Sequence, residues 1–180
     1  MSFYTKTGDD GTTGLLGKDR IKKYDNRMET IGCLDEASAV LGLSRAFVCS
    51  TEIQEIILKV QRQLYLVMGE VASEKEIAEK FRSVNQESVL WIETTIDRIS
   101  QNTSIPSEFI VPGDTKGGSF LALGRTVVRR AERRLVELID AGVIENQELL
   151  RYLNRLSSLL FVLELYENYI SGKGEQTLVK

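Results

Sequence analysis

Histidine is missing from this sequence, and cysteine and proline are scarce. The 180 residues contain no His, two Cys and two Pro. Without imidazole, neither a His-ligated zinc centre nor a Ser–His–Asp triad can be built. The two cysteines, Cys33 and Cys49, are too few for a disulfide framework and do not form a CxxC pair. We therefore expect two reduced thiols and a cytoplasmic location.

Long apolar runs and an excess of positive charge are also missing. The longest purely apolar run, residues 159–163, is much shorter than a membrane span, and the first six residues lack the apolar core of a signal peptide. With 23 basic and 26 acidic residues the net charge is −3, which argues against a nucleic-acid partner. Because 42% of the residues are apolar and 27% charged, the composition fits one domain with its own core and no membrane contact.

Helical periodicity runs through most of the chain after a head rich in Gly, Thr and Asp. The periodic segments and their punctuation predict helices at Asp25–Val48, Glu52–Ala72, Asn85–Asn102, Gly118–Ala141 and Asn146–Ser171. Asp25 and Thr51 are suitable N-caps, and Gly142 and Gly172 follow two of the segments as C-terminal stops. Residues 73–84 suit a connector or a short surface helix. We expect an all-α fold, a five-helix bundle with a glycine-rich N-terminal loop.

Charged residues divide the helix predicted at 118–141 into two sides. On a helical wheel, Arg130, Arg133 and Arg134 form a solvated face. Arg125, Arg129 and Glu132 instead fall beside leucines and valines on the side that should face the bundle. A buried charge needs a partner or a ligand, so this stripe predicts a carboxylate or a phosphate nearby. The alternative is a structural ion-pair network.

Two polar residues on other helices could meet this stripe. Asp35 shares a wheel face with Met28 and Ile31, so we expect it to point into the bundle and to clasp an arginine. The alternative is a salt bridge that only fixes helix register. Asn154 lies in the most apolar helix, where it either contacts a ligand or satisfies a neighbouring backbone group.

The head places Gly at every third position from Gly8 to Gly17. Such a segment can present backbone N–H groups and Thr hydroxyls to a polyphosphate. It does not match the P-loop pattern GxxxxGK[ST], and the alternative is a mobile tail. A second loop, Thr103 to Lys116, holds both prolines and the sequence FIVPG, and ordered loops of this length are often functional.

Taken together, these residues resemble the ATP:corrinoid adenosyltransferases of the propanediol-utilisation type. The motifs that carry the resemblance are YTKTGDDGTTGLLG at 4–17, K-x-D-x-R at 23–27, G-x-x-DE at 32–36, FIVPG at 109–113, RTVVRRAERR at 125–134 and LNRLSSLLF at 153–161. The resemblance implies a trimer of helical bundles with active sites between subunits. There the 5′-deoxyadenosyl group of ATP, which carries Mg²⁺, is transferred to the cobalt of reduced cobalamin and triphosphate is released. It also implies a single domain over 1–180, with a nucleotide-binding head at 1–24 and the bundle at 25–180.

The resemblance also assigns roles to individual residues. The positions that match ATP-contacting residues are Thr5, Lys6, Thr7, Gly8, Thr13, Lys23, Arg129, Arg130, Ala131, Glu132, Arg133 and Asn154. Asp35 and Arg125 match a salt bridge that shapes the corrinoid side, and with Phe109 and Arg129 they form the expected catalytic set. Phe109 matches the aromatic residue that keeps the lower nucleotide base of the corrinoid off the cobalt, and the alternative is a loop anchor that fills a bundle end. No residue is assigned to a resident metal.

Three positions depart from the family pattern. Asp114 stands where a second Gly is usual, Ala122 replaces a His, and Ser158 replaces an Asp. None of them touches the Asp35/Arg125 or Arg129/Asn154 sets. Two other functions stay open: an ATP-responsive module that binds or delivers corrinoid without transferring anything, and a purely structural bundle. A reductase or an adenosylcobalamin-dependent enzyme is a possible protein partner.

Overall fold

Five long helices, one single-turn helix and a small hairpin make up the computed structural model, which describes residues 4–82, 84–173 and 175–179. The elements are β1 (Thr12–Gly14), β2 (Arg20–Lys22), α1 (Asn26–Phe47), α2 (Thr51–Ala72), α3 (Ala78–Phe81), α4 (Gln86–Ser100), α5 (Lys116–Asp140) and α6 (Gln147–Ile170). The predicted helical bundle is therefore confirmed. Residues 1–3, 83, 174 and 180, which belong to the predicted single domain, lie outside the described part.

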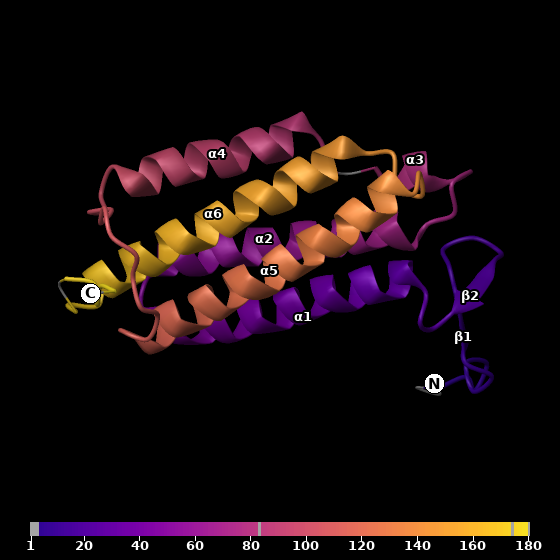
Figure 1. The fold of residues 1–180 in the computed structure, drawn as a ribbon, viewed down its shortest axis with the longest axis horizontal. Helices are drawn as coiled ribbons and strands as arrows, with labels where there is room; N and C mark the ends of the chain where they lie inside the picture. Colours follow the sequence, from indigo (N-terminus) through magenta and orange to yellow (C-terminus); the bar gives the residue numbers. More distant parts are fainter. Residues whose placement is uncertain (1–3, 83, 174, 180) are drawn as a thin grey trace.

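The long helices lie side by side, with α1 and α5 in the closest association (Figure 1). α1 also packs on α2, and α5 packs on α6. α4 lies along the outer side of α6 as an added fifth rod, while α3 forms a single turn between α2 and α4.

Local side chains explain where the helices begin and end. Asp25 accepts a hydrogen bond from the N–H of Arg27 and caps α1, as predicted. α2 begins at Thr51 itself, so its N-cap is Ser50 and the predicted cap was one residue late. Gly142 and Gly172 have φ values of 68° and 78°, the left-handed conformation that glycine adopts most easily at a helix C-terminus.

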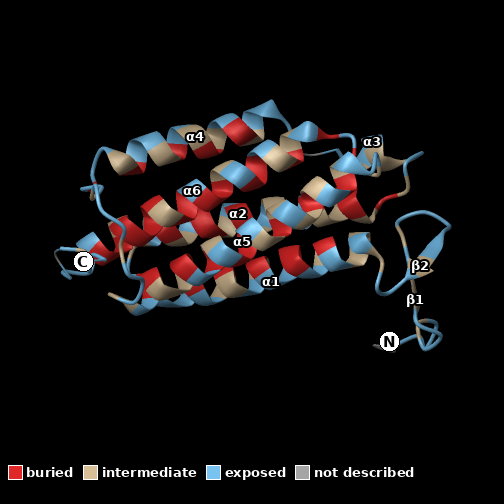
Figure 2. Cartoon of the chain, in the orientation of Figure 1, coloured by how far each residue is buried: buried red, intermediate tan, exposed pale blue. Residues whose placement is uncertain are grey.

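The core lies between the long helices and is almost entirely aliphatic (Figure 2). α6 is buried on most sides because α5 and α4 both pack on it. Its one fully buried aromatic residue, Tyr152, donates a hydrogen bond from its hydroxyl to Gln63 Oε1 at 2.8 Å. Of the described helices, none is both long enough and apolar enough to span a lipid bilayer.

The head forms a two-stranded antiparallel hairpin, which the sequence analysis did not predict. Thr13 pairs with Ile21 at the centre of the register. The hairpin lies beside the start of α1, whereas the loop between α4 and α5 and the C-terminal segment lie at the opposite end of the bundle (Figure 1).

Candidate functional site

The head brings several of the predicted ATP-contacting residues together. A Cβ added to Gly8 would lie 3.2 Å from Lys23 Nζ and 3.1 Å from the carbonyl oxygen of Thr12, which is tighter than an ordinary side-chain contact. A hydrogen bond of 2.8 Å connects the hydroxyl groups of Thr5 and Thr7. Lys6, between them, adopts a left-handed φ of 61°. Lys23 and the two threonines therefore lie around one short turn of backbone.

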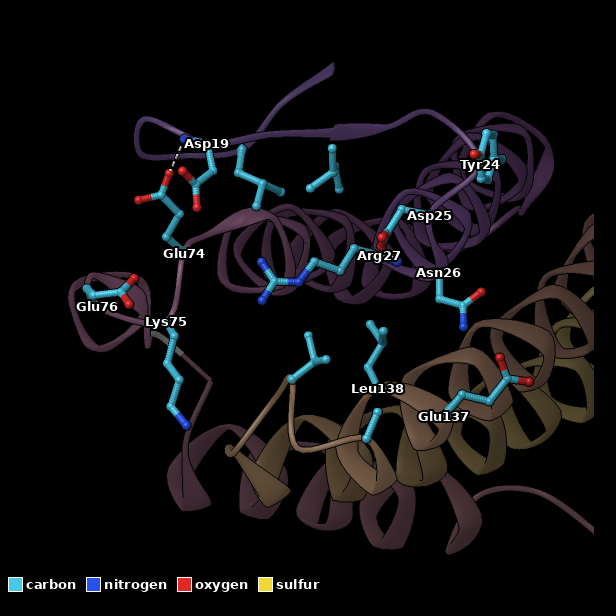
Figure 3. Close-up of a pocket in the computed structure, with 14 residues that line it drawn as sticks. Asp19, Tyr24, Asp25, Asn26, Arg27, Glu74, Lys75, Glu76, Glu137 and Leu138 are labelled. Carbon is cyan, nitrogen blue, oxygen red and sulfur yellow. Dashed lines mark hydrogen bonds between the residues drawn. The ribbon is translucent and has the colours of Figure 1, made fainter. Parts of the chain in front are cut away.

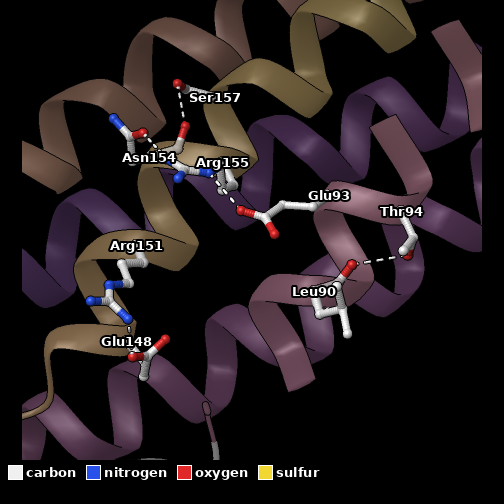
Figure 4. A network of polar contacts seen from close by, with 8 residues as sticks. All are labelled: Leu90, Glu93, Thr94, Glu148, Arg151, Asn154, Arg155 and Ser157. Carbon is white, nitrogen blue, oxygen red and sulfur yellow. Dashed lines mark hydrogen bonds and ion pairs between the residues drawn. The ribbon is translucent and has the colours of Figure 1, made fainter. Parts of the chain in front are cut away.

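A chain of polar contacts crosses from α5 through α6 to α4. Asn154 donates through Nδ2 to Glu132 Oε1 at 2.9 Å and accepts from Arg155 Nη1 at 2.8 Å. Arg155 in turn pairs with Glu93 on α4 at 2.9 Å, and Figure 4 shows this part of the network. Both hydrogen-bond partners of the exposed Asn154 side chain are side chains, so the alternative that it satisfies a neighbouring backbone group is wrong among the described residues. Glu132 and Asn154, two of the predicted ATP-contacting residues, are thus hydrogen-bonded to each other, a contact that the sequence analysis did not predict.

The arginines of α5 do not divide as the helical wheel predicted. Arg129 is exposed, because the buried stripe of α5 is centred on Val128, Ala131 and Leu135 and leaves Arg129 on its outer side. The expectation that Arg129 faces the bundle is therefore wrong. Arg130, expected to be solvated, is half-buried at the border with α1, where it forms an ion pair with Glu36.

Arg125 and Asp35 lie beside different neighbouring helices. Asp35 is exposed and lines a mostly apolar hollow with residues of α2, so the expectation that it points into the bundle is wrong. Its neighbour Glu36 is the residue of α1 that turns toward α5. Arg125 lies on the α6 side of α5, with its guanidinium 5.9 Å from the centre of the Phe161 ring. No ion pair joins Asp35 to Arg125 within the described residues.

The loop that carries Phe109 is held by the C-terminal segment. The Val111 N–H donates to the Thr177 carbonyl at 2.7 Å, and the Val179 N–H donates to the Phe109 carbonyl at 2.8 Å. The Phe109 side chain is 86% exposed, so it does not fill a bundle end and the loop-anchor alternative is wrong for the single chain. A ring this exposed is available to contact a ligand or a second chain.

Asp114, one of the departures from the family pattern, holds the C-terminal segment in place through hydrogen bonds. Its carboxylate accepts hydrogen bonds from the N–H and hydroxyl of Thr177 at 2.9 and 2.6 Å, and it lies 3.4 Å from Lys173 Nζ. Burial alone would raise the pKa of Asp114, but the hydrogen bonds from Thr177 and the nearby Lys173 outweigh it and hold the pKa below its ordinary value. The other departures are unremarkable: Ala122 is buried and Ser158 is exposed.

The predicted residues do not surround one hollow in a single chain. The head lies at one end of the bundle and the Phe109 loop at the other. A hollow of about 620 Å³ lies between the head and the ends of α1 and α5 (Figure 3). Its charged lining consists of Asp19, Asp25, Glu74, Glu76, Glu137, Arg27 and Lys75. Five carboxylates against two cations repel a triphosphate, and none of the predicted site residues lines this hollow.

Three charged residues to which the sequence analysis assigned no individual role are buried or connect helices. Glu93 forms an ion pair with Arg155. Its surroundings in the sequence are those of any acidic residue on an exposed helix face, so no signal in the sequence indicated this role. Glu164 is only 1% exposed, and its position directly after the apolar run 159–163 was a signal that could have found it. Arg27, in the K-x-D-x-R motif, donates to the Ser73 carbonyl at 2.8 Å and connects α1 to the end of α2.

Comparisons with known proteins agree on one family. The model of the cobalamin adenosyltransferase family matches residues 3–167. The "Corrinoid adenosyltransferase PduO" of Salmonella typhimurium is 38% identical over 169 residues, which are 93% of this chain and 50% of that protein. The "Corrinoid adenosyltransferase" of Bacillus subtilis is 37% identical over 179 residues, covering 97% of this chain and 91% of that one. This chain thus spans about half the length of the Salmonella relative.

The fold comparison points the same way. A variant of the PduO-type ATP:corrinoid adenosyltransferase from Lactobacillus reuteri, solved in complex with cobalamin and ATP, superposes with a TM-score of 0.92 at 30% identity. The superposition covers 99% of this chain and 97% of that chain. A second variant of the same enzyme, complexed with ATP, gives a TM-score of 0.90.

Proposed function

Because this chain belongs to the cobalamin adenosyltransferase family, we propose that it transfers the 5′-deoxyadenosyl group of ATP to the cobalt of reduced cobalamin. The products are adenosylcobalamin and triphosphate. The observation that carries the proposal is the near full-length similarity to an enzyme whose structure holds both cobalamin and ATP.

The residue inventory suits this chemistry. Cobalt(I) in reduced cobalamin is itself a strong nucleophile, so a chain without histidine needs no activated serine or cysteine. The cobalt electron pair attacks C5′ of ATP, the Co–C bond forms, the C5′–O bond breaks, and triphosphate leaves with the bonding electrons. The protein then has two tasks: to align cobalt with C5′ and to stabilise the departing negative charge.

We assign the triphosphate to the cationic groups of the head and of α5. Lys23 over Gly8 and the exposed Arg129 are the cations best placed for it, with the Thr5–Gly8 turn and Thr13 supplying backbone N–H groups and hydroxyls. Arg130, Arg133, Glu132 and Asn154 complete the ATP set together with Lys6 and Ala131. Mg²⁺ enters with the nucleotide as part of the substrate. The division into a nucleotide-binding head, 1–24, and a bundle, 25–180, follows from this assignment.

The corrinoid side is assigned to Asp35, Arg125 and Phe109. Because Asp35 lies beside α2, Arg125 lies beside α6 and no ion pair joins them among the described residues, we assign their salt bridge to a contact between two copies of the chain. We therefore propose a homotrimer with active sites between subunits, consistent with the scatter of the site residues along one bundle. We place the enzyme in the cytoplasm because Cys33 and Cys49 are both free thiols. A reductase or an adenosylcobalamin-dependent enzyme remains the proposed protein partner.

The test is direct synthesis. Purified protein is incubated with ATP, Mg²⁺ and chemically reduced cobalamin, and adenosylcobalamin is followed by its absorption spectrum while triphosphate is measured separately. Equal amounts of both products support the proposal. If ATP binds but no Co–C bond forms, the chain is instead an ATP-responsive module that binds or delivers corrinoid. If neither ligand binds, the structural bundle is the correct interpretation.

A further inference from the structure

Glu164 is a buried carboxylate for which the proposed reaction has no use. It lies on α6, is 1% exposed, and neither of its carboxylate oxygens has a hydrogen-bond partner among the described residues. Leaving a buried polar group unpaired is costly, and most such groups in native proteins have a partner or a role. Glu70 and Glu167, which are equally buried, both accept hydrogen bonds. Glu164 therefore stands apart from the other buried acids.

An arginine of the neighbouring helix α5 acts on the unpaired carboxylate electrostatically. Arg125 on α5 lies against Phe161, one helical turn before Glu164, and its Nε–H is buried without a partner in the described part of the chain. Two charged groups act on Glu164 among the described residues: Arg125, and Asp114 in the loop before α5; α1, α2 and α4 add no third. Asp114 is already engaged by Lys173 and Thr177. The Arg125 guanidinium is thus the one free counter-charge available to Glu164.

We propose that Glu164 is a positioning residue that competes from inside the bundle for Arg125, the arginine assigned to the corrinoid side. Ionised Glu164 draws the Arg125 Nε–H inward into a charge-assisted hydrogen bond, and neutral Glu164 leaves the guanidinium free to face Asp35 of a second copy. This inference rests on the proposed function. It makes the apparent KM for corrinoid depend on whether Glu164 is ionised.

The charge of Glu164 changes in the physiological range. Burial, the dominant effect, raises the pKa of the Glu164 carboxyl to about 7, while Arg125 opposes the rise and Asp114 adds to it. With a pKa near 7, the neutral fraction falls about ten-fold between about pH 6 and pH 8. If only the neutral form leaves Arg125 available, the apparent KM for corrinoid rises about ten-fold over this interval.

The first test compares the pH dependence of KM for corrinoid in four proteins. The parent and Glu164→Asp, which keeps a carboxylate, should both show the rise. Glu164→Gln, which is always neutral, should keep the low-pH value throughout. Glu70→Gln is the matched control, because Glu70 is also buried with a raised pKa but lies beside Asn146 and Arg82, away from Arg125, and it should behave like the parent. An unchanged pH dependence in Glu164→Gln overturns the inference.

A second measurement is independent of catalysis. The ¹⁵N–¹H resonance of Arg125 Nε, assigned with Arg125→Lys, is followed by NMR as the pH is raised. In the parent it should shift with a midpoint near that of Glu164, and in Glu164→Gln it should not shift. A resonance that moves identically in both proteins contradicts the competition. If the parent synthesises no adenosylcobalamin, the proposed function fails, and this experiment still decides whether Glu164 controls Arg125.

Discussion

At the level of single residues, the arginines of α5 differ in their exposure and in their ion pairs. These differences indicate which of them is available to bind a ligand. Arg134 forms an i,i+3 pair with Glu137, and Arg130 is held by Glu36. Arg129 makes no side-chain ion pair among the described residues, while its backbone carbonyl accepts a hydrogen bond from Arg133 Nη1 at 3.1 Å. An exposed guanidinium without a carboxylate partner contributes little to stability but is well suited to a phosphate.

Replacing Arg129 by Ala should therefore damage ATP use and leave the fold intact. We expect KM for ATP to rise about ten- to a hundred-fold, the scale of one lost charge-assisted contact, with KM for corrinoid nearly unchanged. The free energy of unfolding should change by less than about 0.5 kcal/mol because the side chain is exposed. Steady-state kinetics and urea denaturation measure both. Arg134→Ala is the matched control, and an equal loss in that variant would contradict the assignment of Arg129.

The buried Glu164 predicts a stability that depends on pH. Its folded pKa, about 7, lies above the ordinary value of 4.5, so the carboxyl stabilises the fold fully only below that ordinary value, and its contribution is lost as the pH rises through 7. At about pH 8, Glu164→Gln should be more stable than the parent by about 2–3 kcal/mol, and at about pH 5 the two should be nearly equal.

Urea denaturation at the two pH values checks this prediction. Glu55→Gln is the control, because Glu55 is exposed on α2 and its replacement should change the free energy of unfolding by less than about 0.5 kcal/mol. A Glu164→Gln variant that is less stable than the parent at the higher pH would show that the hydrogen bond to Arg125 outweighs the cost of burying the charge, and that the folded pKa of Glu164 is not raised.

Among the elements, the C-terminal segment, residues 175–179, holds the loop between α4 and α5 in place. We call this segment the strap. Its backbone pairs with Phe109 and Val111, and Asp114 secures it through Thr177. α6 adds a further contact, since Asn168 donates to Gln176 Oε1 at 2.8 Å and accepts from the Thr115 hydroxyl at 2.7 Å. Gly118 permits this approach of α5 to α6, because a Cβ there would lie 2.3 Å from Asn168 Oδ1.

Removing the Asp114 carboxylate should loosen the Phe109 loop without touching the ATP set. In Asp114→Ala we expect hydrogen-exchange protection of the Val111 and Val179 amides to fall about ten-fold or more, since two hydrogen bonds to a charged group are lost. KM for corrinoid should rise while KM for ATP stays constant. Glu175→Gln, in the same segment but exposed, is the control. Unchanged amide protection would show that the backbone pairing alone holds the strap.

At the scale of the whole molecule, one chain presents an incomplete site. The head, the polar network at Asn154 and the Phe109 loop are spread along the length of the bundle. Asp35 borders an apolar hollow of about 570 Å³ in which Leu66 and Tyr65 are partly or largely exposed. An exposed apolar surface beside an assigned catalytic carboxylate is typical of a contact between subunits.

Subunit mixing tests this arrangement. Asp35→Asn and Arg125→Ala should each be weak in corrinoid use when alone. When the two variants are unfolded together and refolded, about a quarter of the sites in randomly mixed trimers should combine an intact Asp35 from one copy with an intact Arg125 from another, and activity should return accordingly. Sedimentation confirms the assembly state of each sample. No recovery in a well-assembled mixture would place both residues in the same chain's site.

Patterns in the sequence were sufficient to predict the helical bundle, its helix ends to within two residues, and the family. Helical periodicity, the cap at Asp25 and the stops at Gly142 and Gly172 are local features, and local hydrogen bonding and backbone freedom decide them without reference to the rest of the chain. The motifs from residue 4 to residue 161 likewise carry the family resemblance in their order and spacing.

Which face of each helix packs against its neighbours depends on the tertiary structure and could not be predicted from the sequence pattern. A helical wheel gives the angle between residues but not the positions of the neighbouring helices. Arg129 and Asp35 were therefore expected inside, although α5 packs on α1 and α6 with Arg129 outward, and α1 turns Asp35 away from α5. The hydrogen bonds between Asp114 and Thr177 and the approach of Arg125 to the Phe161 ring join residues far apart in sequence. Such contacts depend on how the rods pack, which the local pattern of side chains does not specify.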